Sequence, residues 1–146
     1  MNISRLRPPI VAQTHVDSCW AAVLESWSIV DGHIPRQYQQ RLIHRWGEGG
    51  TGGITPLTKI PVIASALGLQ WGGFHSDALV TYLESHLTES HIFCAYRRGA
   101  FTHAVLIYRF SDRNNISYMD PDGGHDRWKD MDFFLDRGPY TMMRRP

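Results

Sequence analysis

A cysteine stands at the expected start of a helix, in the segment Gln13-Thr14-His15-Val16-Asp17-Ser18-Cys19-Trp20-Ala21-Ala22. After it, apolar side chains recur with the period of a helix that has one buried face, at Trp20, Val23, Leu24 and Trp27. Asp17 or Ser18 is the expected N-cap. A first-turn cysteine lies at the positive end of the helix dipole, among N–H groups without internal partners, and both effects favour the thiolate. The sequence therefore predicts a sulfur nucleophile at Cys19.

Partners for this sulfur are found later in the chain. A thiolate nucleophile needs a histidine that exchanges protons with it and a third group that orients the histidine. His103 lies in a run rich in β-branched and aromatic residues, 101–108, which predicts a strand. Asp120 ends the next predicted strand and enters the turn Asp120-Pro121-Asp122-Gly123-Gly124. Antiparallel neighbours place the start of one strand beside the end of the next, so His103 and Asp120 are expected to lie close together.

Each candidate also has an interpretation without catalysis. Cys19 can be a small buried side chain on an apolar helix, and His103 can be a core histidine whose nitrogens are satisfied by backbone groups. Asp120 can serve only the turn, because its neighbours are turn-forming residues. Gln13 can be a polar residue of a surface loop. From the residues alone, either Asp120 or Asp122 can orient the histidine.

Taken in order, these residues resemble the papain-like cysteine proteases. The resemblance rests on Gln13, on Ser18-Cys19-Trp20-Ala21 opening a helix, on His103 starting a strand and on Asp120-Pro121 closing the next strand. It implies that the Gln13 side chain and the Cys19 backbone amide form an oxyanion hole. It also implies that His103 is the general base and acid and that Asp120 orients it.

The Asp-Pro pair and the short interval between Cys19 and His103 are similar to those of compact bacterial members of this family. These members are bacteriocin-processing peptidases and cysteine protease effectors that are injected into other cells. The chain departs from the family pattern in three places. Asp17 stands where a glycine is common, Thr102 replaces the usual small residue before the histidine, and no tryptophan follows the third catalytic position.

Length and composition fit one globular domain over residues 1–146, since 42% of the residues are hydrophobic. The formal charge of +1 comes from 15 basic and 14 acidic side chains mixed along the chain, which predicts no nucleic-acid partner. No apolar run approaches the roughly twenty residues that span a bilayer, and the N-terminus lacks the apolar core of a signal peptide. We expect a soluble protein with no membrane partner.

The cysteines and histidines predict neither a disulfide framework nor a metal site. With two cysteines only, Cys94 is expected to be a core residue of the strand-like run 91–96. The eight histidines include no Cys-x-x-Cys or His-Glu-x-x-His pattern, and the spacing of His86 and His91 matches no common ligand pair. No cofactor is expected.

The remaining pattern predicts an α+β fold, in which the nucleophile-bearing helix and further helices pack on a C-terminal antiparallel sheet. The glycine-rich segment 47–53 is expected to be a loop, either a simple connector or a lip of the substrate cleft. The third helix is expected to hold Pro61 in its first turn. Helices are expected over 35–46, from about Thr58 to Gly68, over 76–86 and over 130–135, and strands near 91–97, 102–110, 115–119 and 140–143.

Together these residues predict that the protein hydrolyses amide bonds of a protein substrate with Cys19, His103 and Asp120, and that Gln13 stabilises the oxyanion. The resemblance to effectors implies a toxin domain cut from a larger protein, delivered into the cytoplasm of a target cell and neutralised by an immunity protein that covers the active site. The alternatives are a bacteriocin leader-type maturation peptidase and a catalytically idle binding module of the same fold. An isopeptidase or acyltransferase would use the same triad.

Overall fold

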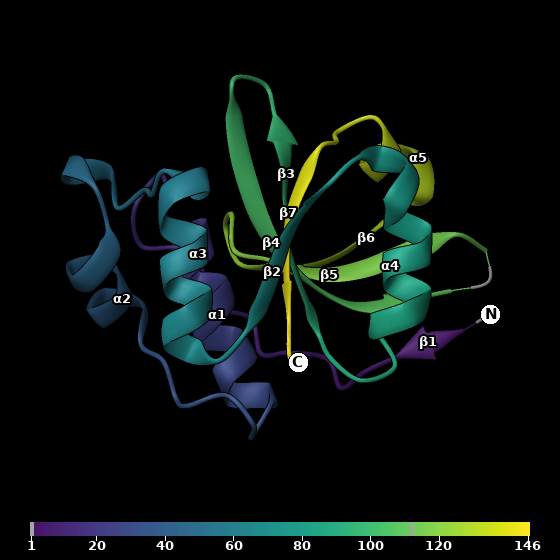
Figure 1. Ribbon diagram of the computed structural model, residues 1–146, viewed down its shortest axis with the longest axis horizontal. Helices are drawn as coiled ribbons and strands as arrows, with labels where there is room; N and C mark the ends of the chain where they lie inside the picture. The colour runs from purple at the N-terminus through teal and green to yellow at the C-terminus, as the bar shows by residue number, and fades with distance from the viewer. Residues whose placement is uncertain (1, 112) are drawn as a thin grey trace.

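The computed structural model describes residues 2–111 and 113–146, which form helices on both sides of an antiparallel sheet (Figure 1). The helices are α1 (Cys19–Val30), α2 (Gln39–Trp46), α3 (Pro56–Leu67), α4 (Leu79–His86) and α5 (Met131–Leu135), with 3-10 turns η1 (Gly49–Thr51) and η2 (Ser76–Ala78). The strands are β1 (Ile3–Ser4), β2 (Gln70–Phe74), β3 (Ile92–Arg98), β4 (Phe101–Phe110), β5 (Asn115–Asp120), β6 (His125–Asp130) and β7 (Tyr140–Arg144).

The strands follow the order β2-β7-β3-β4-β5-β6, and β1 pairs with the far end of β4. Every pairing is antiparallel. Strand β4 lies between β3 and β5, and its pairing with β5 ends at Leu106 and Met119, one position before Asp120. His103 is therefore a diagonal neighbour of Asp120 on the same face of the sheet, within reach of a long side chain.

Two clusters of buried side chains cover the two faces of the sheet. In Figure 1, α1, α2 and α3 lie on one side of the sheet and α4 and α5 on the other. Alternate residues of β3 and β4 point to opposite clusters: Phe93 and Leu106 pack with α1 and α3, whereas Cys94 and Val105 pack with α4 and α5. Burial on both faces explains why these strands are apolar almost throughout, and it confirms that Cys94 is a core residue.

The strands expected near 91–97, 102–110, 115–119 and 140–143 and the short helix before Leu135 are confirmed. The helix expected from Pro35 is wrong at its start, because α2 begins at Gln39 and Tyr38 before it is extended. The backbone N–H of Gln39 donates to the Glu25 carboxylate of α1 at 2.6 Å. This long-range cap fixes the first residue of α2, and no local pattern encodes it.

The third helix begins at Pro56, two residues before the expected start at Thr58. A proline suits the first helical position, where its missing N–H would have no partner. Pro61 was expected in the first turn of this helix, and this is wrong: because the helix begins at Pro56, Pro61 lies in its interior. Gly68 ends α3 in the left-handed conformation, with φ of 70°, as its position predicts.

Strands β1, β2 and β6 were not expected from the sequence. β2 carries two adjacent glycines, and β6 is exposed along its whole length. Both lie at the edges of the sheet, where a strand needs no buried face and shows no alternation of apolar and polar residues.

Candidate active site

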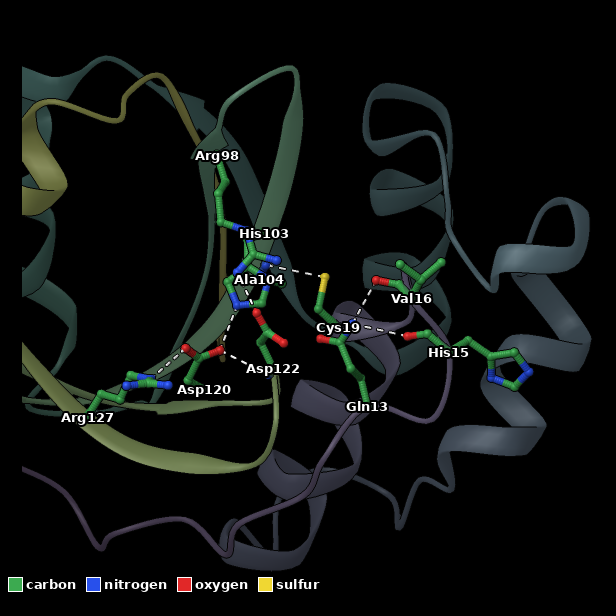
Figure 2. A network of polar contacts seen from close by, with 10 residues as sticks. All are labelled: Gln13, His15, Val16, Cys19, Arg98, His103, Ala104, Asp120, Asp122 and Arg127. Atoms are coloured by element: carbon green, nitrogen blue, oxygen red, sulfur yellow. Dashed lines mark hydrogen bonds and ion pairs between the residues drawn. The ribbon is translucent and has the colours of Figure 1, made fainter.

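His103 and Asp120 are joined by a short hydrogen bond (Figure 2). His103 Nε2 lies 2.7 Å from Asp120 Oδ1, and since an ionised carboxylate only accepts, the ring nitrogen donates. The imidazole is buried, with 1% of its surface exposed, and it packs nearly perpendicular to the Tyr96 ring. Position and orientation of the imidazole are therefore fixed by the sheet and by Asp120.

Asp120 accepts two further hydrogen bonds that hold the carboxylate in place. The backbone N–H of Asp122 donates to Oδ1 and Arg127 Nε donates to Oδ2, each at 3.0 Å. Asp122 itself turns away and pairs with Arg98 at 2.9 Å. The sequence allowed either Asp120 or Asp122 to orient the histidine, and in the structure Asp120 is the one that contacts His103.

Burial is the largest influence on the pKa of both members of this pair, and it opposes their charged forms. The hydrogen bonds of His103 to Asp120 and Cys19, and the charges of these groups, nevertheless raise the pKa of His103 above its ordinary value. Hydrogen bonds from His103 and Asp122, with the charges of His103 and Arg127, hold the pKa of Asp120 below its ordinary value. The arrangement favours an imidazolium–carboxylate pair.

Cys19 is the first residue of α1 and lies against the start of β4. Its thiol acts on the His103 ring and helps to raise the pKa of the imidazole, and because Nε2 is used by Asp120, Nδ1 is the ring atom available to the sulfur. The backbone N–H of Ala104 points at Sγ over 3.4 Å. The residue keeps 8% of its surface exposed and lines a cavity.

Ser18, one of the two residues expected as N-cap, occupies the N-cap position of α1, but its side chain makes no hydrogen bond to the first turn of the helix. Its hydroxyl contacts Gln39 Oε1 at 3.0 Å and the His15 carbonyl at 3.1 Å instead. The buried Gln39 amide also accepts from the N–H of Thr14 and donates to the Ala12 carbonyl. One side chain of α2 thus fixes the loop that leads into the nucleophile.

Gln13 lies beside Cys19, but its amide donors are directed elsewhere (Figure 2). Nε2 donates to the carbonyls of Val16 at 2.8 Å and His15 at 3.1 Å, and Oε1 is buried without a partner. The Gln13 backbone is anchored to the Pro121 carbonyl at 2.9 Å, next to the Asp120 turn. The structure brings Gln13 to the site, and its predicted role as an oxyanion donor, which requires the amide to turn, stays a prediction.

Arg127 is a site residue that was not predicted from the sequence. The residue belongs to β6, whose exposed pattern gives no strand signal. The turn after Asp120 offered one clue, since it returns the chain as a hairpin that pairs Asp120 with His125. Arg127, two positions further, is then a diagonal neighbour of Asp120.

A cavity of about 260 Å³ opens beside Cys19, bordered by the glycine-rich loop 47–53. The loop is closed by a bridge between Glu48 and Gly53, and the Trp20 indole N–H donates to the Gly52 carbonyl at 2.8 Å. The glycine-rich loop therefore takes the place expected for a lip of the cleft.

In the described ranges 2–111 and 113–146, no group of three or more histidine, cysteine, aspartate or glutamate side chains is arranged to hold a metal ion. Over the same residues, none of the helices combines the length and the apolar character needed to cross a bilayer.

No protein-family model matches the chain, and no curated protein matches it by sequence. Solved structures resemble it. The peptidase domain of Streptococcus ComA, described as a bifunctional ABC transporter involved in a quorum-sensing pathway, shares 19% identity over 96% of this chain and 100% of that domain, with a TM-score of 0.69. The peptidase domain of Streptococcus mutans ComA shares 21% identity over 94% and 98% of the two chains, with a TM-score of 0.61.

The same Streptococcus mutans domain in complex with a small-molecule inhibitor gives 20% identity, the same coverage and a TM-score of 0.62. This likeness concerns the fold. It confirms the predicted α+β, papain-like architecture, with N-terminal helices and a C-terminal antiparallel sheet.

Proposed function

We propose that the protein is a cysteine peptidase that hydrolyses peptide bonds with Cys19, His103 and Asp120. The observation that carries this proposal is a buried imidazole that hydrogen-bonds the Asp120 carboxylate, while the next residue, Ala104, donates its N–H to the Cys19 sulfur and so places the thiol beside the histidine. That is the arrangement a thiol nucleophile requires. The likeness to peptidase domains supports the same class of reaction.

In the proposed mechanism, the proton of Cys19 moves to His103 and the sulfur attacks the substrate carbonyl carbon. The new S–C bond places negative charge on the carbonyl oxygen, which the Cys19 backbone N–H stabilises together with Gln13 once its amide has turned. The tetrahedral intermediate collapses as the C–N bond breaks and His103 protonates the leaving amine.

His103 then removes a proton from water, which attacks the thioester. The C–S bond breaks, the acid product leaves, and the proton held by His103 returns to the sulfur. Throughout the cycle Asp120 stabilises the imidazolium, and Arg127 and the Asp122 N–H hold the Asp120 carboxylate in position.

A maturation role, removal of a leader from an exported peptide, has better support than the toxin role. The solved structures that resemble this chain include the peptidase domain of an ABC transporter. The delivered toxin and its immunity protein remain predictions. Expression of wild-type and Cys19→Ala proteins in several bacterial hosts separates the two roles, because a toxin stops growth through Cys19 and a maturation peptidase with a narrow substrate does not.

The decisive test of the proposed function is cleavage of a proteome-derived peptide library, with new termini identified by mass spectrometry. The wild type and Cys94→Ala, which changes a buried thiol on the opposite face of β3, should produce the same new termini. Cys19→Ala should produce none. Absence of cleavage by all three proteins, although each is folded, would favour the idle binding module.

A further inference from the structure

The cavity beside Cys19 has apolar walls that come from four parts of the chain. The lining includes Trp20 of α1, Ile54 directly after the glycine-rich loop, Ile60 of α3 and Phe93 of β3. Its volume of about 260 Å³ is large enough for a long side chain. The hydrogen bond from Trp20 to the Gly52 carbonyl keeps the indole wall and the loop wall together, so the cavity exists before a ligand enters.

Two carboxylates stand at the rim of this cavity. Asp17 and Glu48 line it and are both exposed, and no lysine, arginine or histidine lies among the lining residues. Both oxygens of Glu48 accept from Thr55, from its N–H and its hydroxyl, so the position of the carboxylate is fixed. Within residues 2–111 and 113–146, no donor is paired with the Asp17 carboxylate.

The position of Asp17 is set by the loop opposite it. Its backbone N–H donates to the Thr51 carbonyl at 3.1 Å, and a Cβ at Gly53 would come within 2.9 Å of its own Cβ. A glycine at position 53 is therefore required for Asp17 to stand at this rim.

We propose that the cavity binds an arginine or lysine side chain of the substrate, close to the bond that Cys19 attacks. This inference rests on the proposed peptidase function. The methylene stem of such a side chain would lie along the apolar walls, and its charged end would reach Asp17 and Glu48 at the rim. The Phe101 ring, 73% exposed, is also part of the lining, and an aromatic ring attracts a cation placed over its face.

Other side chains fit this cavity less well. A neutral apolar side chain of the same length fills the cavity but gains nothing from the two carboxylates, and an acidic side chain is repelled by them. Glycine or alanine would leave the cavity empty. Because both carboxylates are exposed and screened by solvent, we expect a preference of about tenfold for arginine over methionine, decreasing at high salt.

The test uses a peptide library in which every sequence occurs with arginine, methionine or glutamate at one varied position near the cleaved bond. Values of kcat/KM should fall in that order for the wild type. Asp17→Asn and Glu48→Gln should each reduce the ratio of arginine to methionine, and the double variant should bring it close to one. Glu84→Gln, which removes an exposed carboxylate from α4 across the sheet, is the matched control and should keep the wild-type ratio.

Binding of the same library to Cys19→Ala gives a readout without catalysis. Arginine peptides should be enriched in the bound fraction, and adding the Asp17→Asn and Glu48→Gln substitutions should abolish the enrichment. Equal binding of arginine and methionine peptides, or a ratio unchanged by the double variant, overturns the inference even if cleavage occurs. Enrichment of arginine peptides without any cleavage by the wild type supports the cavity assignment and refutes the proposed peptidase.

Discussion

Replacing Asp120 tests the most constrained contact in the candidate active site. Asp120 accepts from three donors: His103 Nε2, the Asp122 N–H and Arg127 Nε. In Asp120→Asn one oxygen can still accept from His103 and Asp122, but the new NH₂ group faces Arg127, which is also a donor. Arg127, with 43% of its side chain exposed, can turn away into solvent.

The expected losses follow from these contacts. A hydrogen bond to a charged acceptor is worth about 1 to 2 kcal/mol more than a neutral one, which corresponds to a loss of about tenfold in kcat/KM for Asp120→Asn. Asp120→Ala leaves the buried Nε2–H of His103 without an acceptor and should cost at least about a hundredfold. Arg127→Ala removes one half-exposed ion pair, so the loss in the wild-type background should not exceed about fivefold.

The assay is kcat/KM on one cleaved peptide, with the free energy of unfolding measured for each variant to confirm folding. In the Asp120→Asn background, Arg127→Ala should cause no further loss, because it removes the opposing donor. If the losses of kcat/KM from the two substitutions multiply instead, the new NH₂ group at position 120 and the Arg127 side chain do not oppose each other. A greater loss for Asp122→Ala than for Asp120→Ala would refute the assignment of the orienting carboxylate.

Three other outcomes are expected. Iodoacetamide should modify Cys19 well before Cys94, whose pKa is raised by complete burial, and equal rates in the folded protein would argue for an inert Cys19. Gln13→Ala should lower kcat by about a hundredfold if the amide turns to the oxyanion, whereas an unchanged kcat would assign Gln13 to the loop alone. The pKa of His103 is raised in the folded protein, so its contribution to stability is complete below pH 6.5, its ordinary pKa, and is lost as the pH rises through its folded-state pKa. The pKa of Asp120 is lowered in the folded protein, so its contribution is complete above pH 3.8, its ordinary pKa, and is lost as the pH falls through its folded-state pKa. Urea denaturation of the wild type and Asp120→Ala should therefore differ most between these two ordinary values, and a difference independent of pH would contradict the ion pair.

The contact between His103 and Asp120 was predictable because it depends on strands that are adjacent in sequence. Two apolar strands and a short turn fix their register closely enough to bring the side chains together. The helix that begins at Cys19 was predictable for a similar local reason, the period of its apolar residues. In both cases a buried face leaves a pattern in the sequence.

The parts that could not be predicted depend on contacts distant in sequence or on exposed strands. Arg127 lies on an edge strand without a buried face, and the first residue of α2 is fixed by Glu25 of another helix. The orientation of the Gln13 amide depends on where the carbonyls of His15 and Val16 point in an irregular loop. No periodicity describes such a loop.

The hydrogen bonds of Gln39 have a consequence for local unfolding. Helix α2 has eight residues, too few to be stable alone, and Gln39 at its start is tied to Thr14, Ser18 and Ala12. Opening of α2 would release the loop before Cys19 at the same time, so the two segments form one cooperative unit. Their amide hydrogens should exchange with solvent at a common rate, and a substitution that loosens α2 should speed exchange in the nucleophile loop without touching the triad.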